Sequence, residues 1–442
     1  MQDTVHIDTL IEARWIIPVD PQQSVLNHHA IAINQGKIIG ILPINSAHTR
    51  FKALKIIALN NHVLIPGLIN LHTHAAMILM RGLADDLPLM EWLSKHIWPT
   101  ESRHVNASFV LDGTRLACAE MLRGGITCFN DMYFFPEASA QAVLDSGMRA
   151  SIGMIAIDFP TAYANDADDY LAKGMALRDK LHSEPLLSFC FAPHAPYTVS
   201  DKTLANILTY AEQLEVPIHI HLHETLDEIS LSIKSHGVRP IERMHQLGLL
   251  SPGLIAVHMV HLTDNEIRLI KQHGCHTVHC PSSNLKLASG FAPVTSLLDN
   301  NINVGLGTDS AASNNRLDMF EEMRLTALLA KASSNHADAL PAHQALEMAT
   351  INNARALGID EITGTLASGK AADITAVDFS DLHLSPCYDP VSHLVYAAGR
   401  EQVSHVWVNG KMLLEDKKLT TLDSAELHNR AVYWEECIKS TA

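Results

Sequence analysis

Strand-like and helix-like stretches alternate along most of this chain, and this alternation most limits the fold it can adopt. Between residues 64 and 364, eight apolar runs are each followed by room for a helix; they cover residues 64–72, 126–130, 150–157, 186–192, 217–222, 254–258, 276–279 and 303–307. Apolar side chains recur every three or four positions most clearly over residues 203–214, and residues 107–122 and 317–331 are similar. Eight strand-then-helix units predict a closed parallel (β/α)8 barrel, the TIM barrel. An open doubly wound sheet is the alternative, but no Gly-x-Gly-x-x-Gly follows any run.

The two ends of the chain differ from the middle. Before residue 64 we expect no helix, and short β-branched runs predict strands at residues 10–19, 30–33 and 37–42. Short strands and turns return after residue 364, with a hairpin signal at Asn409-Gly410 and a terminal helix over 425–440. We expect residues 1–63 and 365–442 to form one small β-sandwich domain, split around a barrel that spans residues 64–364.

Composition limits the kind of partner. The chain has 32 Lys and Arg against 48 Asp and Glu, a formal charge of −16, and no basic run. Nucleic acids and anionic lipid surfaces bind basic patches, so we expect neither as a partner. No stretch approaches the roughly 18–20 apolar residues of a membrane span, and the residues from Met1 to His6 have no signal-peptide pattern. A small molecule is the expected partner, in the cytoplasm.

Histidines and acids gather where the predicted strands end. These positions are His72 and His74, His194, the run from His219 to Glu224, His258 and Asp309. The carboxyl ends of the strands of a parallel barrel meet at one face, and active sites form there. Neutral imidazole and carboxylate are ligands for zinc and similar ions, so we predict a metal site at that face.

Spacing narrows the set of ligands but does not complete it. Residues two apart in a strand point to the same side, so His72 and His74 leave the first strand together. With Asp309 and one fifth-strand histidine they would hold one divalent ion, which lowers the pKa of a bound water to about 7. Three histidines of the fifth strand share a face, and the ligand remains open among His219, His221 and His223.

Other residues at the strand ends are candidates for proton transfer. Glu224 is the candidate to move protons between the water and a substrate, although its parity places it on the opposite side from the neighbouring histidines. Asp309 is a candidate both to ligate the ion and to accept a proton from the nucleophile. His258 is the candidate to orient a developing tetrahedral centre.

Several of these residues lie within longer motifs. Pro66-Gly67-Leu68 leading to His74, His221-x-x-Glu224 and Gly307-Thr308-Asp309, in this order, resemble the amidohydrolase superfamily. Four runs are similar, more narrowly, to the methylthioadenosine/S-adenosylhomocysteine deaminase group: residues 98–101, 192–198, 281–287 and 307–315. The similarity extends from the N-terminal β segment to about residue 410.

The resemblance implies a site and a reaction. It implies one metal ion, usually zinc with Fe²⁺ or Mn²⁺ as alternatives, and these ligands: His72, His74, His221 and Asp309. Glu224 would contact the substrate as proton shuttle, with His258 near the nucleophilic water. Glu101 would hold the ribose hydroxyls, since a carboxylate accepts two hydrogen bonds from a vicinal diol, and His194 would contact the purine.

The implied activity is hydrolytic deamination of a 6-aminopurine nucleoside to the inosine analogue and ammonia. The implied substrates are 5′-methylthioadenosine, S-adenosylhomocysteine and adenosine, and the resemblance also implies a homodimer. Another enzyme of the same scaffold, of the triazine hydrolase or guanine deaminase type, is the nearest alternative. A metal-free scaffold protein is an alternative of a different class.

One position departs from the deaminase group. Some members carry an arginine shortly after the third strand; here Arg149 precedes that strand, and no other arginine occurs until Arg178. This departure predicts a weak grip on an anionic amino-acid tail and a preference for methylthioadenosine or adenosine. Met77, Met80 and residues 83–89 are candidates for an apolar wall facing a sulfur substituent.

The cysteines are consistent with an intracellular protein and exclude a second type of zinc site. Seven cysteines, an odd number, occur with no Cys-x-x-Cys pair, which predicts reduced thiols. Zinc deaminases of another type use His-x-Glu with Pro-Cys-x-x-Cys. Cys280-Pro281 has the reverse order and no second cysteine nearby, so that plan does not apply.

Overall fold

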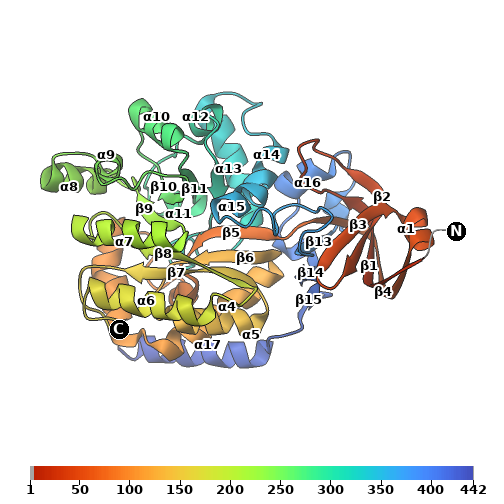
Figure 1. Ribbon diagram of the computed structural model, residues 1–442, viewed down its shortest axis with the longest axis horizontal. Helices are drawn as coiled ribbons and strands as arrows, with labels where there is room; N and C mark the ends of the chain where they lie inside the picture. The colour runs from red at the N-terminus through yellow and green to blue at the C-terminus, as the bar shows by residue number, and fades with distance from the viewer. Residues whose placement is uncertain (1–3, 442) are drawn as a thin grey trace.

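The computed structural model describes residues 4–441 and has two parts, a barrel and a smaller sheet (Figure 1). The barrel strands are parallel neighbours in sequence order: β5 (Leu68–Thr73), β6 (Ile126–Asp131), β7 (Arg149–Ala156), β8 (Leu187–Pro193), β9 (Ile218–Leu222), β10 (Leu254–His258), β11 (His276–His279) and β12 (Val304–Leu306). Each overlaps one of the eight predicted runs, so the predicted (β/α)8 barrel is confirmed.

Helices follow the barrel strands and cover the outside of the barrel. They are α4 (Ala107–Arg123), α5 (Pro136–Ser146), α6 (Ala167–Leu181), α7 (Asp201–Leu214), α8 (Leu226–His236), α9 (Pro240–Gln246), α10 (Asp264–His273), α11 (Pro281–Lys286), α12 (Val294–Asp299), α13 (Met319–Ser334), α14 (Ala342–Met348) and α15 (Ile351–Ala356). The three helices predicted between residues 64 and 364 correspond to α4, α7 and α13. In α7 the side chains of Leu204, Ile207 and Ala211 are buried, as the amphipathic pattern requires.

The side chain of Asn353 joins the first and last barrel strands, β5 and β12, by hydrogen bonds. Asn353 Nδ2 donates to the carbonyls of Ile69 at 2.6 Å and Leu306 at 2.9 Å. A Cβ atom on Gly307 would lie 2.8 Å from the backbone nitrogen of His72, so a glycine here lets the two ends approach. This close contact between β5 and β12 places the residues after β12 beside His72.

The smaller part is one continuous sheet built from both chain ends. Its order is β16-β15-β14-β13-β4-β1-β2-β3, with β1 (Val5–Ile16), β2 (Leu26–Asn34), β3 (Lys37–Pro43), β4 (Phe51–Pro66), β13 (Ile374–Asp378), β14 (Val403–Val408), β15 (Lys411–Glu415) and β16 (Lys418–Leu419). Antiparallel pairing of β13 with β4 joins the two ends of the chain. The predicted joining of the chain ends in one β domain is therefore confirmed.

Two local predictions are wrong. A helix, α1 (Ile44–Arg50), occurs where we expected none; it buries only Ala47, so it has no strong amphipathic pattern. The run over residues 64–72 is not one strand, because β4 ends at Pro66 in the small sheet and β5 begins at Leu68 in the barrel. A Cβ atom on Gly67 would lie 2.1 Å from Thr127 Oγ1, so a glycine lets the chain pass between the two sheets.

A cap of short helices connects β5 to β6. It consists of η1 (Ala75–Met80), α2 (Leu89–Trp92), a π-helical turn η2 (Leu93–Ile97) and α3 (Trp98–His104); we call it the cap segment. The terminal helix α17 (Ser424–Lys439) runs along the barrel beside α4, and Arg103 of the cap donates to the carbonyl of Thr441 at 2.8 Å (Figure 1). The remaining short helices are η3 (Leu382–Leu384), α16 (Pro390–Tyr396) and η4 (Arg400–Gln402).

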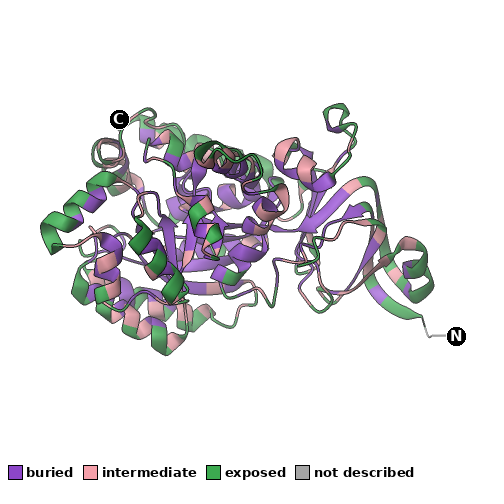
Figure 2. Cartoon of the chain, turned by 90° about the horizontal axis from the view of Figure 1, so that it is seen from above, coloured by how far each residue is buried: buried purple, intermediate pink, exposed green. Residues whose placement is uncertain are grey.

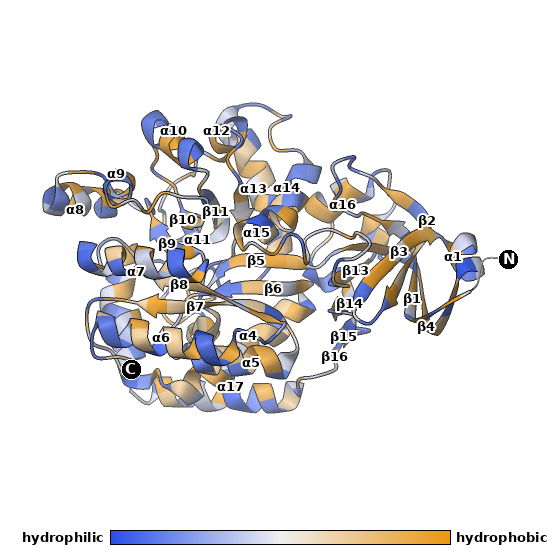
Figure 3. Ribbon diagram, viewed as in Figure 1, coloured by the Kyte–Doolittle hydropathy of each residue, from blue (hydrophilic) through white to orange (hydrophobic). Residues whose placement is uncertain are grey.

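The main core lies in and around the barrel. The barrel strands are buried along nearly their whole length (Figure 2), and β5 is mostly hydrophobic (Figure 3), whereas the surrounding helices expose their outer faces. Within residues 4–441, the structure contains no helix with both the length and the apolar character needed to cross a membrane. Because the strands are held rigidly, side chains at their ends can be placed with little freedom.

Candidate active site

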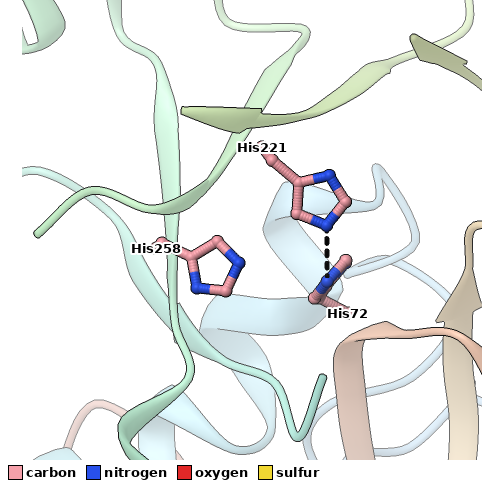
Figure 4. Close-up of side chains that lie close together, drawn as sticks. All are labelled: His72, His221 and His258. Carbon is pink, nitrogen blue, oxygen red and sulfur yellow. Dashed lines mark hydrogen bonds between the residues drawn. The ribbon is translucent and has the colours of Figure 1, made fainter. Parts of the chain in front are cut away.

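The histidines at the strand ends converge at the carboxyl end of the barrel. His72 comes from β5, His221 from β9 and His258 from the last position of β10, and the Nε2 atoms of His72 and His221 are 3.2 Å apart. Figure 4 shows the three rings turned toward one another from separate strands. One nitrogen atom from each ring lies within 4.8 Å of the others.

A second group shares His72 with the first. Asp309 Oδ1 lies 3.4 Å from the Nε2 atoms of both His72 and His74. The ring of His74 stacks on that of His221, with the ring centroids 5.2 Å apart. The structure thus brings the four predicted ligands together, with His258 at the side of the group.

A neighbouring group holds the second nitrogen of each ring. His74 Nδ1 lies 2.5 Å from the carbonyl oxygen of Met132, and His221 Nδ1 lies 2.6 Å from that of His194. His258 Nδ1 lies 2.9 Å from Asn284 Oδ1, and His72 Nδ1 lies 3.0 Å from His219 Nε2. An Nδ1–H that donates to a carbonyl leaves the Nε2 of a neutral ring with a free lone pair. Such contacts, which fix both tautomer and ring orientation, are typical of metal-ligating histidines.

The carboxylate of Asp309 is held from the side away from the histidines. Its Oδ2 accepts hydrogen bonds from the hydroxyls of Ser283 at 2.6 Å and Ser313 at 2.8 Å. Its Oδ1 accepts the backbone N–H of Ser310 at 2.7 Å and faces the imidazoles. Three donors therefore aim the remaining lone pairs of Oδ1 at the space between the rings.

Left-handed backbone conformations occur where three strands enter the site. The φ angles are +56° at His223, +74° at His258 and +60° at Asp309. These conformations are unfavourable for residues with side chains, and they concentrate at functional sites. The turn at His223 also explains why strand parity failed for Glu224, because the chain changes direction before that residue and Glu224 lines the cavity.

The three histidines of the fifth strand have different positions. His221 lies in the ligand group, His219 contacts His72 from behind, and His223 turns away so that its Nδ1 donates to the carbonyl of His261 at 2.9 Å. The alternation of a strand explains the first two, since residues two apart share a face. Of the three histidines that spacing left open as the fifth-strand ligand, only His221 lies in the ligand group.

Glu224 lies between the ligand group and a supporting carboxylate. Its Oε2 is 3.8 Å from His258 Nε2, and Glu228 accepts the backbone N–H groups of His223 at 2.9 Å and Glu224 at 2.8 Å. Burial raises the pKa of Glu224, although the nearby His258 opposes this shift. A carboxyl group with a raised pKa can exchange a proton near neutral pH.

Burial lowers the pKa of several of the clustered imidazoles. It lowers the pKa of His72 to about 4 and that of His194 to about 3, and it holds the pKa of His221 well below the ordinary value. Burial alone would raise the pKa of Asp309, but its interaction with His72 and the other imidazoles holds it well below its usual range. Neutral imidazoles beside an ionised carboxylate are the donor set that a divalent cation needs.

A cavity of about 840 Å³ opens above the ligand group. His194, Glu224 and His258 line it near the strand ends, and Glu101 of α3 lines it from the cap segment. The hydroxyl of Tyr133 donates to Glu101 Oε1 at 2.8 Å. Loss of hydration raises the pKa of Glu101 to about 7, although this hydrogen bond opposes the shift.

Sequence reasoning missed most of the groups that support the site. Ser283 and Asn284 lie in the motif over residues 281–287, so their polar types inside a long motif were an available signal. Tyr133 and Glu228 carried no signal, because their partners are found only through the tertiary fold. Of the predicted residues, Glu101, His194, Glu224, His258 and the four ligands all face this cavity or its floor.

Comparison with known proteins identifies the class of protein to which this site belongs. The amidohydrolase family matches residues 63–413. A 5-methylthioadenosine/S-adenosylhomocysteine deaminase of Saccharophagus degradans is 50% identical over 440 residues, which cover 100% of this chain and 99% of that protein. The chain therefore belongs to the amidohydrolase family and, within it, to the methylthioadenosine/S-adenosylhomocysteine deaminase group.

Two further relatives agree. A 5′-deoxyadenosine deaminase of Methanosarcina mazei is 41% identical over 426 residues, covering 96% of each protein. The crystal structure of an adenosine deaminase from Xanthomonas campestris, with bound zinc, superposes with a TM-score of 0.98 at 46% identity. It covers 99% of this chain and 100% of that chain, so both the barrel and the small sheet are shared.

Proposed function

We propose that this protein is a metal-dependent hydrolase that removes the 6-amino group from adenine nucleosides. The observation that carries the proposal is the convergence of imidazole Nε2 atoms and Asp309 Oδ1 beside Glu224, at the floor of a nucleoside-sized cavity. Adenosine and its 5′-substituted analogues are the proposed substrates, since the relatives are named for such compounds. The products are the corresponding inosine and ammonia.

The donor set fits a divalent cation, and zinc is our choice. Three neutral imidazoles and one carboxylate are ligands that zinc prefers, and the proposed set is His72, His74, His221 and Asp309. The zinc reported in the Xanthomonas campestris structure supports the choice. Bound there, such an ion would lower the pKa of a water molecule and so supply a nucleophile at neutral pH.

The proton movements fall to residues of the chain. The carboxyl group of Glu224 delivers its proton to the purine ring nitrogen next to C6, and it regains a proton from the hydroxyl group added at C6 when the C6–N bond breaks. The departing amino group takes the proton that Asp309 has received from the attacking water, and it leaves as ammonia. Asp309 is the proposed acceptor of the proton from the water that attacks C6. Because His258 Nδ1–H donates to Asn284 Oδ1, the ring has an Nε2–H only in its protonated form; burial opposes that form, but the carboxylates of Glu224 and Asp309 raise the pKa of His258. In this form, Nε2–H donates to the oxygen that develops at C6.

Two residues are proposed to recognise the nucleoside. Glu101 accepts the ribose hydroxyls, since an ionised carboxylate is an acceptor for a vicinal diol. His194 contacts the purine from the wall between β8 and β9; its ring centroid lies 5.0 Å from that of His221. Glu224 also contacts the ring through the proton that it delivers.

The walls favour an uncharged 5′ substituent. Among the described residues that line the cavity there is no lysine or arginine, and most of the cap residues are apolar, for example Met77, Trp92 and Ile97. Arg149 is 3.0 Å from Asp373 at the opposite end of the barrel and is therefore not available to a substrate. We propose that methylthioadenosine and adenosine are preferred to S-adenosylhomocysteine, whose amino-acid tail carries charge.

Ammonia release from a panel of nucleosides tests the proposal. Zinc-loaded protein should release ammonia from adenosine and methylthioadenosine, with a lower kcat/KM for S-adenosylhomocysteine. Glu101→Ala distinguishes the nearest rival, because it should weaken the use of nucleosides, whereas an enzyme for guanine or triazines has no ribose for Glu101 to bind. Absence of ammonia from every nucleoside, or no metal in the purified protein, would reject the proposal.

A further inference from the structure

Tyr133 is a neighbour of the proposed ribose-binding carboxylate that no role above explains. It follows β6, its side chain is buried, and its ring lies 6.4 Å from that of His74 while its hydroxyl reaches Glu101 Oε1 at 2.8 Å. Tyr133 therefore spans the cavity wall from the ligand group to the cap segment. The ring lies at the end where C6 would react, and the hydroxyl lies at the end where ribose would bind.

The hydrogen bonds of Glu101 are incomplete. Within residues 4–441, the Tyr133 hydroxyl is the one side-chain donor to the Glu101 carboxylate, and no lysine or arginine forms an ion pair with it. An ionised carboxylate can accept hydrogen bonds from about four donors. When it is poorly hydrated and has a single donor, its ionised form is energetically unfavourable. Glu101 lines the cavity, where two ribose hydroxyls would complete the set of donors.

We infer that Tyr133 is a positioning residue for ribose recognition, because it holds one oxygen of Glu101 so that the carboxylate presents its free lone pairs to the vicinal diol. The inference rests on the proposed function. It adds a source of specificity, since the site then favours nucleosides with an intact diol. Tyr133 acts through Glu101 and takes no part in the proton transfers at C6.

The hydrogen bond also links ribose binding to pH. The Tyr133 hydroxyl donates to the ionised form of Glu101, so its removal leaves that form less stable and raises the carboxyl pKa further above about 7. Tyr170 of α6 is the other titratable group that responds to the charge of Glu101, and its hydroxyl lies 2.5 Å from Thr161 Oγ1. His104, which lies in α3 with Glu101, instead forms a hydrogen bond with Thr441 Oγ1 at 2.7 Å.

The test compares Tyr133→Phe with the wild type on two substrates. For adenosine, the variant should raise KM about tenfold and change kcat by less than about twofold, since a hydrogen bond to a charged group is lost only in binding. For 2′,3′-dideoxyadenosine, which offers no diol, wild type and variant should have the same KM. Tyr170→Phe, which removes another buried and hydrogen-bonded tyrosine hydroxyl, is the matched control and should leave the adenosine KM unchanged.

The pH profile supplies a readout that a structural defect would not give. In the wild type, the KM for adenosine should rise as pH falls through about 7, while the KM for the dideoxy compound should not. In Tyr133→Phe the rise for adenosine should begin at higher pH. This wild-type comparison needs no variant, so it can still overturn the inference if Tyr133→Phe fails to fold: if diol binding does not depend on the ionisation of Glu101, Tyr133 has no ribose-binding carboxylate to position.

The possible results distinguish a failure of the proposed function from a failure of the role inferred for Tyr133. No ammonia from adenosine with the wild type would overturn the proposed function. Normal activity on adenosine, with an unchanged KM in Tyr133→Phe or with the same pH dependence for both substrates, would overturn the inference alone. A fall in kcat without a change in KM would also overturn it, since it would place Tyr133 in the chemical step.

Discussion

The two ends of this barrel both bury charged and polar side chains, but they use them differently. At the amino end, Arg149 pairs with Asp373 at 3.0 Å and donates to the Pro185 carbonyl at 3.0 Å, and Asp373 Oδ1 accepts the Asn409 N–H at 2.7 Å. At the carboxyl end, the imidazoles and Asp309 each keep an atom facing a shared space. Closed networks stabilise the fold, whereas open ones leave ligand atoms for a cation and a substrate.

The contrast teaches how to recognise a site in a chain with many buried polar groups. The amino-end network connects the barrel to the small sheet and satisfies its own donors and acceptors. The carboxyl-end groups are held by other residues on one side only, and two of them, His258 and Asp309, have left-handed backbone conformations. In this protein, a functional site is distinguished from a structural network by rigidly held polar atoms that have no partner within the fold. Burial or charge alone does not make this distinction.

The largest expected effect comes from removing a ligand at the open end. Asp309→Ala should leave the purified protein without stoichiometric metal and reduce deamination to background, since the other ligands are neutral and Asp309 supplies the negative charge. Elemental analysis together with an ammonia assay measures both. His223→Asn, in the same strand-end cluster but outside the ligand group, should keep the metal; equal metal in both variants would contradict our ligand set.

The next largest effect separates proton transfer from metal binding. Glu224→Gln keeps the shape of the side chain but cannot carry the proton, so kcat should fall by about 10²–10⁴ while the bound metal is retained. Steady-state kinetics and elemental analysis on the same preparation check this. Turnover close to that of the wild type would remove Glu224 from its proposed role.

The closed end should respond in stability rather than activity. Arg149→Met leaves the Asp373 carboxylate buried without its partner, and we expect the free energy of unfolding to fall by about 3–5 kcal/mol. Denaturant unfolding measures the loss, and the activity per folded molecule should stay unchanged. Pairing Arg149→Met with Asp373→Asn should recover part of it, because the uncompensated charge is then gone. A fall in the activity of the folded fraction would contradict the comparison.

The smallest expected effect concerns the supporting residues. Ser283→Ala removes one hydrogen bond to Asp309 and should weaken metal affinity by about 10-fold, because outer-shell partners typically contribute 10- to 100-fold. Competition with a chelator measures this affinity. Thr375→Val at the closed end, which removes the 2.7 Å bond to the Gly125 carbonyl, is the matched variant. It should lower stability without changing metal affinity; an affinity loss in both variants would erase the distinction between the two ends.

Much of the fold was predictable because its signals are local. The eight apolar runs and the helix over residues 203–214 follow periods that depend only on backbone geometry, and the barrel follows from their order. The division of the first run at Gly67 was not predictable, since it depends on how closely Thr127 approaches from the next strand. Helix α1 was missed because it buries a single side chain.

The site was predictable as a set of residues but not as an arrangement. His72, His74 and Asp309 could be chosen from strand ends alone, whereas His219, His221 and His223 stayed equivalent until the turn at His223 was known. The same turn brings Glu224 to the cavity, although strand parity alone placed it on the side opposite the histidines.

The sequence by itself determined the alternation of strands and helices, the chemical types at the strand ends and the family motifs, because each of these is written in spacing along the chain. Only the tertiary structure decided which nitrogen of each histidine is held and which faces the common space. It also decided that Tyr133 meets Glu101 and that Arg149 meets Asp373. These contacts join residues that are distant in sequence, and their geometry depends on how all the strands pack, which no local pattern encodes.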